Sequence, residues 1–343
     1  MSFAGQTRRI VDETLTAFLG RAVAGLAATR PSLVPIAEAT RELVLRGGKR
    51  LRPIVAVAGY VAAGGTRVEE AARLTSGLEL LQAYLLVHDD WMDGDETRRG
   101  GKTLHVRFAE RWGRHLGDAA AVLAGDLCSA WARELLLDAP AGAFSPAALL
   151  AAQRVYASFE AEVVQGQMLD LLGLEGAVPV EDLEDLKTGS YTVRGPLRLG
   201  AALAEAPAAL QEGLLAFGTP LGRAFQIRDD LLGLFGEPAR TGKAVGKDLG
   251  AGKRTWLVDR ALTTLSAPDV ARLRRVLGRP DAPEADKLEV IALLRDGGPR
   301  ADAEARVAAL CGQARDALGR TAVTAEGREM LEELVGSLAR RDA

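Results

Sequence analysis

Apolar residues recur every three or four positions along most of this chain, which is the spacing of amphipathic helices. The pattern predicts helices over residues 6–28, 33–46, 68–93, 115–137, 146–171 and 208–235, with further helix over 254–338. Glycine and proline fall at the joins between these segments. No segment shows the alternation that is typical of a β-strand. The sequence therefore predicts an all-α fold, organised as one large helical domain over residues 1–343.

The predicted helix over 68–93 ends in a concentration of acidic residues. Asp89, Asp90 and Asp93 lie in its last turns, and Gly94 is the expected helix stop. The helix dipole disfavours negative charge at this end, and Asp89 and Asp93 are one turn apart on the same face. A bound Mg²⁺ would explain the cluster, because this ion takes one or two carboxylates and fills its other positions with phosphate and water. A solvated acidic helix end is the alternative.

A second acidic pair, Asp229 and Asp230, lies near the end of the predicted helix over 208–235. A glycine-rich loop follows, and it contains Lys243 and Lys253. The first arrangement is thus repeated, with paired aspartates on a helix and then a basic loop. If the two clusters face each other across a helical bundle, they form a cage of carboxylates for several Mg²⁺ ions.

A further basic segment lies upstream, where two glycines end the predicted helix over 33–46. Lys49, Arg50 and Arg52 follow, and Pro53 suits the first turn of the next helix. The helix dipole disfavours cations at an N-terminus, so their presence there indicates a bound anion that faces both the side chains and the free N–H groups. A solvated basic loop is the alternative.

Other basic residues lie close to the acidic clusters in the sequence. Arg98 and Arg99 follow the first cluster, and they could either neutralise its acids or contact the same anionic ligand. Lys187 could pair with Glu184 or contact phosphate, and the sequence leaves these alternatives open. Apolar side chains next to both clusters predict a ligand with a diphosphate head and an apolar tail. These side chains are Leu78, Leu81, Tyr84, Leu85, Leu221 and Phe225.

Composition limits the partners and the compartment. The 343 residues are 48% hydrophobic and carry a net charge of −3, which gives no general attraction to nucleic acid or anionic membranes. Cys128 and Cys311 are the only cysteines, which are too few for a disulfide framework and suit a reducing cytoplasm. We find neither a secretory signal nor a run of apolar residues long enough to span a bilayer, so we expect a cytoplasmic protein without a transmembrane helix.

The motifs together resemble those of the trans-isoprenyl diphosphate synthases, over roughly residues 40–260. The Asp-Asp-x-x-Asp of residues 89–93, followed by two arginines, resembles the first aspartate-rich motif of that family. Residues 47–53 are similar to its isopentenyl diphosphate site, and Asp229 and Asp230 match its second aspartate motif. Gly233 stands where many members have a third aspartate, and metal affinity is the property that we expect this departure to affect.

The resemblance implies a helical bundle of the isoprenoid synthase type with a central substrate cavity, and a homodimer. It also assigns roles in three sets. The metal ligands, expected to hold three Mg²⁺ ions per active site, would be Asp89, Asp90, Asp93, Asp229 and Asp230. The isopentenyl diphosphate ligands would be Lys49, Arg52, Gln82 and Arg99. The residues around the allylic diphosphate and the reacting carbons would be Arg98, Lys187, Thr188, Gln226, Lys243 and Lys253.

The implied reaction is the head-to-tail condensation of isopentenyl diphosphate with dimethylallyl, geranyl or farnesyl diphosphate. The metals and the surrounding cations would stabilise the departing diphosphate, which would then accept the released proton. His88 lies beside the acids, and we expect it to hydrogen-bond there rather than to act as a base. The catalytic set is then Asp89, Asp93, Arg98, Lys187, Thr188, Gln226 and Asp229.

Two residues are expected to set the length of the product. Tyr84 lies five residues before Asp89, about 7.5 Å along the helix axis, where its ring can form the floor of the cavity. Leu85, the next residue, is smaller than an aromatic. In the family, aromatics at both positions accompany a C15 product, and one at the fifth position alone resembles C20 synthases. We therefore expect geranylgeranyl diphosphate, with farnesyl diphosphate as the alternative.

Two other classes of protein share part of this pattern. A class I terpene cyclase is also helical and rich in acidic residues, but it uses no second substrate, so residues 47–53 would have no role. A non-catalytic subunit of a heteromeric synthase usually lacks an aspartate motif, whereas both pairs are present here. The sequence leaves open the allylic primer, the exact chain length and the pathway served.

Overall fold

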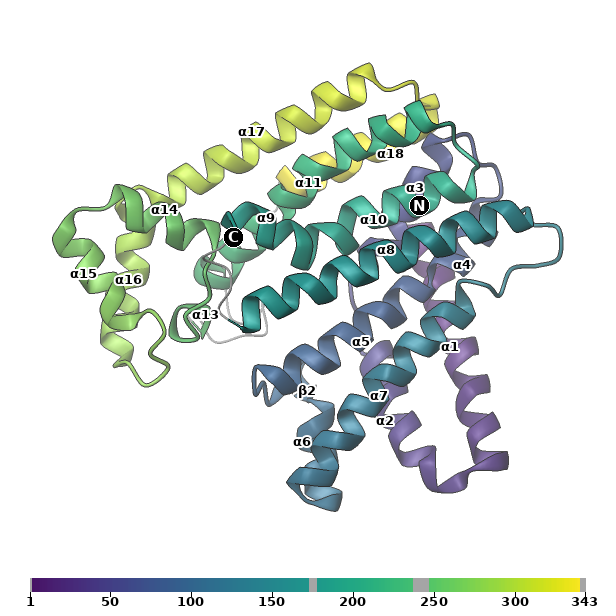
Figure 1. The fold of residues 1–343 in the computed structure, drawn as a ribbon, viewed down its shortest axis with the longest axis horizontal. Coiled ribbons are helices and arrows are strands. Elements are labelled where there is room, and N and C mark those ends of the chain that lie inside the picture. Colours follow the sequence, from purple (N-terminus) through teal and green to yellow (C-terminus); the bar gives the residue numbers. More distant parts are fainter. Residues whose placement is uncertain (1, 173–177, 237–246, 340–343) are drawn as a thin grey trace. The chain divides into compact units, whose positions relative to one another are not determined.

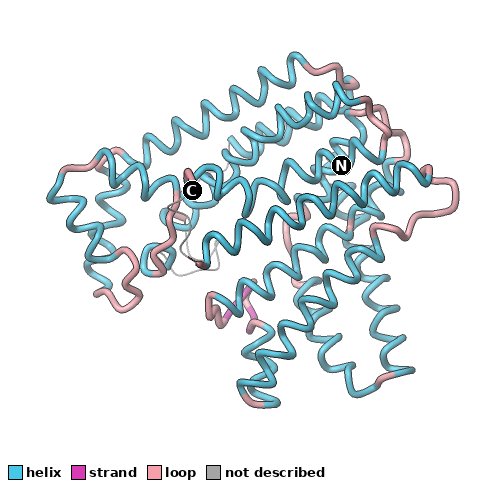
Figure 2. The backbone as a smooth tube through the Cα atoms, viewed as in Figure 1, coloured by secondary structure: helices cyan, strands magenta, loops and turns pink. Residues whose placement is uncertain are grey.

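The computed structural model describes residues 2–172, 178–236 and 247–339, and Figure 1 shows their arrangement. Nearly all regular structure in these residues is helical (Figure 2). The exception there is an antiparallel hairpin of two short strands, β1 (Thr97–Arg98) and β2 (Gly101–Lys102). The all-α prediction is therefore confirmed. None of the described helices combines the length and the apolar character that crossing a membrane requires.

The chain divides into two compact units. The first contains Met1–Val155 and Pro196–Ala206, and the second contains Tyr156–Gly195 and Pro207–Ala343. The long helix α8 (Pro146–Leu171) contributes to both units. Each unit carries one of the two aspartate pairs, so we describe the units separately. The expectation of a single domain over residues 1–343 stays a prediction.

Helices of the first unit pack through the apolar faces that the sequence pattern predicts. Its elements are α1 (Phe3–Thr29), η1 (Pro31–Leu33), α2 (Val34–Leu45), α3 (Leu51–Ala62), α4 (Val68–Thr75), α5 (Gly77–Met92), α6 (Leu104–Trp112), α7 (Arg114–Leu135) and most of α10 (Gly195–Leu203). In the core between α2, α5, α6 and α7, Leu43, Val87, Phe108 and Ala124 are all buried.

The predicted helix over 68–93 is wrong in one respect, because the chain forms two helices, α4 and α5, with Ser76 between them. The hydroxyl of Ser76 donates a hydrogen bond to Ala72 O at 2.8 Å, and such bonds compete with regular helix. Gly77 then allows α5 to lie close to α7, since a Cβ at this position would be 2.6 Å from Ala132 O. The direction of α5 is thus fixed by a tertiary contact that the hydrophobic pattern does not contain.

Arg50 is a buried connection between four elements of the first unit. It precedes α3 with a left-handed φ of 49°, and its side chain is 3% exposed. Its guanidinium donates to Asp12 Oδ1 at 2.8 Å, to Glu79 Oε2 at 3.0 Å and to Val44 O at 3.1 Å. The prediction that Arg50 faces an anion beside Lys49 and Arg52 is wrong, because its side chain is buried and pairs with two carboxylates.

The second unit is built around α11 (Ala208–Phe235), which lies alongside α17 (Pro299–Arg320) in Figure 1. Phe217 and Leu214 on α11 and Leu310 and Ala314 on α17 are buried there. The remaining elements are the end of α8, α9 (Val180–Glu184), the π-helical segment η3 (Asp185–Arg194), α13 (Lys247–Gly250), α14 (Trp256–Thr264), α15 (Ala267–Val276), α16 (Glu284–Asp296) and α18 (Ala325–Ala339).

The Arg50 network generates a prediction about stability. The Glu79→Gln substitution leaves the buried guanidinium without one of its two carboxylate partners, so the free energy of unfolding should fall by about 3 kcal/mol. The exposed pair of Arg9 and Glu13, with side chains 54% and 62% exposed, offers a matched control. Glu13→Gln should change the free energy by less than about 1 kcal/mol. Urea unfolding followed by circular dichroism compares the two, and equal losses would contradict this account of Arg50.

Candidate functional site

The three aspartates of the first motif have different surroundings at the end of α5. Asp89 is partly exposed, Asp93 is exposed, and Asp90 is buried with 2% of its surface accessible. The helix ends where the sequence predicts, because Asp93 N donates to Asp89 O at 2.8 Å and Gly94 adopts a left-handed φ of 65°. Two carboxylates one turn apart are therefore accessible, while the third faces the protein.

Asp90 is bound to Arg98, which lies on β1. Arg98 donates to Asp90 Oδ1 through Nε at 2.7 Å and also through Nη2. It lies 3.3 Å from Asp95 Oδ2 and 3.9 Å from Asp89 Oδ2. Burial alone would lower the pKa of Arg98, but the hydrogen bonds that it donates to Asp90 and the surrounding negative charge outweigh burial and raise it. Arg98 therefore stays charged beside the accessible carboxylates.

Arg99 lies in the turn between β1 and β2, in a concentration of positive charge. Its Nη1 donates to Gly47 O at 2.5 Å, and a Cβ on Gly48 would be 3.3 Å from its Nη2. Burial lowers the pKa of Arg99, and the charges of Arg50, Arg52 and Arg98 lower it further, against the opposing charge of Glu79. The positive charges of Arg50, Arg52 and Arg98 near Arg99 favour an anion in this region, and guanidinium groups suit the oxygens of a diphosphate.

The residues predicted to share that anion lie on α3 and α5, which pack together. Lys49 is exposed just before α3, and Arg52 lies partly buried in the first turn of that helix. Gln82 on α5 is buried, and its Oε1 has no hydrogen-bond partner among the described residues. Guanidinium groups and a helix N-terminus in one place form a favourable site for phosphate.

Tyr84 and Leu85, the residues predicted to set chain length, are both partly buried on α5. The ring of Tyr84 lies 4.7 Å from the ring of His88, measured between centroids, in an edge-to-face arrangement. His88 Nε2 lies 3.0 Å from Val122 O on α7, and a Cβ at Gly125 would be 2.5 Å from the imidazole. His88 is therefore held against α7, which removes it as a candidate base.

The second aspartate pair divides in the same way as the first. Asp229 is exposed on α11, whereas Asp230 Oδ1 accepts a hydrogen bond from Gln226 Nε2 at 2.8 Å. Asp230 also hydrogen-bonds to the carboxyl group of Glu184, whose pKa is raised by burial to about 7. The motifs do not predict this pair of carboxyl groups, because Glu184 lies on a different helix, α9.

Lys187 and Thr188 lie on η3, the π-helical segment that follows α9. Lys187 Nζ forms an ion pair with Asp170 on α8, so the suggested pairing with Glu184 is wrong. Gly166 makes room for this segment, since a Cβ there would be 2.6 Å from Lys187 N. Wide turns of this kind often occur at functional sites, and sequence periodicity does not identify them.

The structure brings most predicted residues together within their own unit. In the first unit, Gln82 and Asp89 share α5, which packs against α3 with Arg52. Lys49 lies just before α3, and Arg98 and Arg99 belong to the hairpin that follows α5. In the second unit, Gln226, Asp229 and Asp230 share α11, which packs against η3. Lys253 precedes α14, and Lys243 lies outside the described residues.

Comparison with known proteins identifies the family. The polyprenyl synthetase family model matches residues 34–294. A geranylfarnesyl diphosphate synthase of Aeropyrum pernix is 35% identical over 309 residues, covering 88% of this chain and 93% of the relative. A (2E,6E)-farnesyl diphosphate synthase of Mycobacterium bovis is 34% identical and covers 76% of this chain and 70% of its own length.

A solved structure agrees with this result over the whole chain. The geranylgeranyl pyrophosphate synthase of Corynebacterium glutamicum, complexed with isoprenyl diphosphate and magnesium, superposes with a TM-score of 0.90 and 31% identity, covering 100% of both chains. The fold, the aspartate pairs and the basic cluster thus have one explanation, and the chain belongs to the polyprenyl synthetase family of trans-isoprenyl diphosphate synthases, which are prenyltransferases.

Proposed function

We propose that this prenyltransferase condenses isopentenyl diphosphate with allylic diphosphates in a magnesium-dependent reaction and that its main product is geranylgeranyl diphosphate. The observation that carries the proposal is the cation cluster around Arg99, next to the accessible carboxylates of α5. A farnesyl diphosphate synthase is the alternative. Relatives named for C15, C20 and C25 products support a short-chain enzyme without selecting one length.

The accessible carboxylates fit magnesium. No group of three or more His, Cys, Asp or Glu side chains in the described parts of the chain is placed to hold a metal alone. Mg²⁺ usually needs only one or two carboxylates, with phosphate and water completing its shell. We assign two ions to Asp89 and Asp93 and a third to Asp229. Asp90 orients Arg98, and Asp230 orients Gln226. When bound, the ions supply positive charge that neutralises the leaving diphosphate.

The residues that we propose as phosphate ligands form two sets, one for each substrate. We assign the diphosphate of isopentenyl diphosphate to Lys49, Arg52, Gln82 and Arg99. Gln82 would donate to this diphosphate through its amide nitrogen, because its oxygen can only accept a hydrogen bond. We assign the allylic diphosphate to Arg98, Lys187, Lys243 and Lys253.

The proposed reaction needs no protein base. The allylic C–O bond breaks, and its electron pair leaves with the diphosphate. The double bond of isopentenyl diphosphate then forms the new C–C bond to the allylic carbon, and the released diphosphate takes the proton that is lost. Thr188 and Gln226 stabilise the allylic cation with their oxygen atoms, and the protein must exclude water, which would trap it. His88, held at Val122 O, takes no part in the proton transfer.

We also propose that the protein acts as a homodimer in the cytoplasm. Leu116 and Leu123 lie seven residues apart on α7 and are 59% and 66% exposed, and Leu137, just beyond the end of this helix, is 56% exposed. Large apolar side chains in water are costly, which supports a second copy of the chain as a partner that covers them.

The role of Asp89 can be tested directly. Asp89→Ala removes one of two accessible carboxylates, so incorporation of labelled isopentenyl diphosphate should fall by about a hundredfold or more. Asp138→Ala is the control, since this acid pairs only loosely with Arg21, at 3.6 Å on the surface. Near-normal turnover of Asp89→Ala would reject the assignment. Consumption of the allylic substrate by the unmodified enzyme without isopentenyl diphosphate would instead favour a terpene cyclase.

Product length tests the role of Tyr84. Tyr84→Ala removes the ring that we propose as the cavity floor, so products longer than C20 should appear. Leu85→Phe adds a ring at the next position and should shift products toward C15. Mass spectrometry of the hydrolysed products measures both shifts. If neither variant changes the distribution, the floor lies elsewhere.

A further inference from the structure

We propose that Trp256 is a positioning residue that fixes Lys253 for contact with the allylic diphosphate. This inference rests on the proposed function, because it takes the role of Lys253 from there. Lysine is a point charge on a flexible stem, so its effect on a phosphate depends on where its backbone is held. Lys253 lies three residues before Trp256, and both ends of this short segment are anchored.

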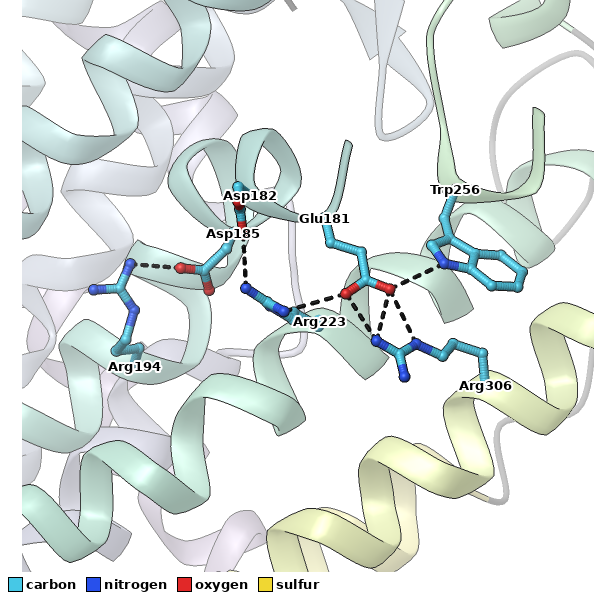
Figure 3. Close-up of polar contacts among 7 residues, drawn as sticks. All are labelled: Glu181, Asp182, Asp185, Arg194, Arg223, Trp256 and Arg306. Carbon is cyan, nitrogen blue, oxygen red and sulfur yellow. Dashed lines mark hydrogen bonds and ion pairs between the residues drawn. The ribbon is translucent and has the colours of Figure 1, made fainter. Parts of the chain in front are cut away.

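Trp256 is the downstream anchor, and two carboxylates of α9 bind it. The backbone N–H of Trp256 donates to Glu184 Oε1 at 3.0 Å, and its indole N–H donates to Glu181 Oε1 at 3.1 Å. Figure 3 shows the indole contact, with Glu181 pointing from α9 toward the ring of Trp256. The start of α14 is therefore tied by both backbone and side chain to the helix that leads into η3.

Glu181 is itself held by two arginines. Arg306 on α17 donates to both of its oxygens, at 2.7 and 2.8 Å, and Arg223 on α11 donates to Oε2 at 3.1 Å (Figure 3). A second nitrogen of Arg223 reaches Asp182 at 2.9 Å. The Glu181 side chain is 21% exposed, so solvent screens it only in part. This forked arrangement fixes the carboxylate before it meets Trp256.

Close backbone packing forms the upstream anchor. Gly252 has a left-handed φ of 75°, and a Cβ there would be 2.9 Å from Gly278 Cα. The N–H groups of Gly252 and Gly278 both donate to Leu249 O at 3.0 Å, and Leu249 is buried. The segment that carries Lys253 thus spans only a few residues between two fixed points.

Loss of the downstream anchor should therefore affect one substrate. The proposed ligands of isopentenyl diphosphate belong to the first unit, whereas Trp256 and Lys253 belong to the second. Releasing Trp256 lets the ammonium group of Lys253 sample positions away from the allylic diphosphate. The enzyme should then bind the allylic diphosphate more weakly, while its affinity for isopentenyl diphosphate stays the same.

The test uses Trp256→Phe, which keeps an aromatic ring and removes the indole N–H. The KM for the allylic diphosphate should rise about tenfold, the factor that corresponds to one hydrogen bond to a charged group. The KM for isopentenyl diphosphate and the melting temperature should stay close to those of the unmodified enzyme. Glu181→Gln removes the charge of the carboxylate that accepts the indole N–H and should produce the same selective rise in the allylic KM. An equal rise in both KM values for either variant would overturn the proposal.

A control and a double-mutant cycle separate this inference from the proposed function. Asp302→Asn breaks the pair with Arg260 at 2.7 Å, which also joins α14 to α17, and it should leave both KM values unchanged. In a Lys253→Ala background, Trp256→Phe should have no further effect. If Lys253→Ala itself leaves the allylic KM unchanged, the assignment of Lys253 in the proposed function fails. If Lys253→Ala raises it and Trp256→Phe adds its own full effect, the positioning role fails alone.

Discussion

Like charges held close together at helix ends are the constraint on which this structure depends. Asp89 and Asp93 repel each other where the dipole of α5 is already negative, and the guanidinium groups around Arg99 repel one another near the start of α3. Where such charges are inside the protein, it pairs them, as in the contacts of Arg50 with Glu79 and of Arg98 with Asp90. Where they are accessible, we propose that a ligand supplies the compensating charge, so that the substrate contributes to the electrostatic balance of the protein.

Adjacent aspartates serve different purposes because neighbouring positions on a helix point in different directions. Successive residues are turned by about 100° around the axis, so Asp89 and Asp90 cannot share one environment. In each pair the first aspartate is the more accessible, and the second hydrogen-bonds within its own unit: Asp90 to Arg98, and Asp230 to Gln226. In both pairs, one aspartate is bound within the protein, and the adjacent aspartate is the one that we propose as a metal ligand. Gly233 follows this second pair within α11, so the departure from the family motif leaves the helix intact.

Periodicity predicts this fold well wherever one apolar face decides the structure. The limits of α8 and α11 match the predicted segments 146–171 and 208–235, and Gly94 ends α5 as expected. The predictions fail where a tertiary contact determines the local structure. Examples are the break at Ser76, the burial of Arg50 and the π-helical turn that carries Lys187. The motifs indicate which charged residues could bind a ligand. They do not indicate which aspartate of each pair will instead contact another helix, as Asp230 contacts Glu184.

The proposed function requires that both aspartate groups act on one allylic diphosphate through magnesium. Calorimetry can measure the magnesium-dependent binding of a non-hydrolysable allylic thiolodiphosphate to the unmodified enzyme, to Asp89→Asn, to Asp229→Asn and to the double variant. If both groups bind the same ligand, the two substitutions should be strongly non-additive, with a coupling energy of about 1 kcal/mol or more. Strict additivity, or binding that neither substitution weakens, would contradict the account.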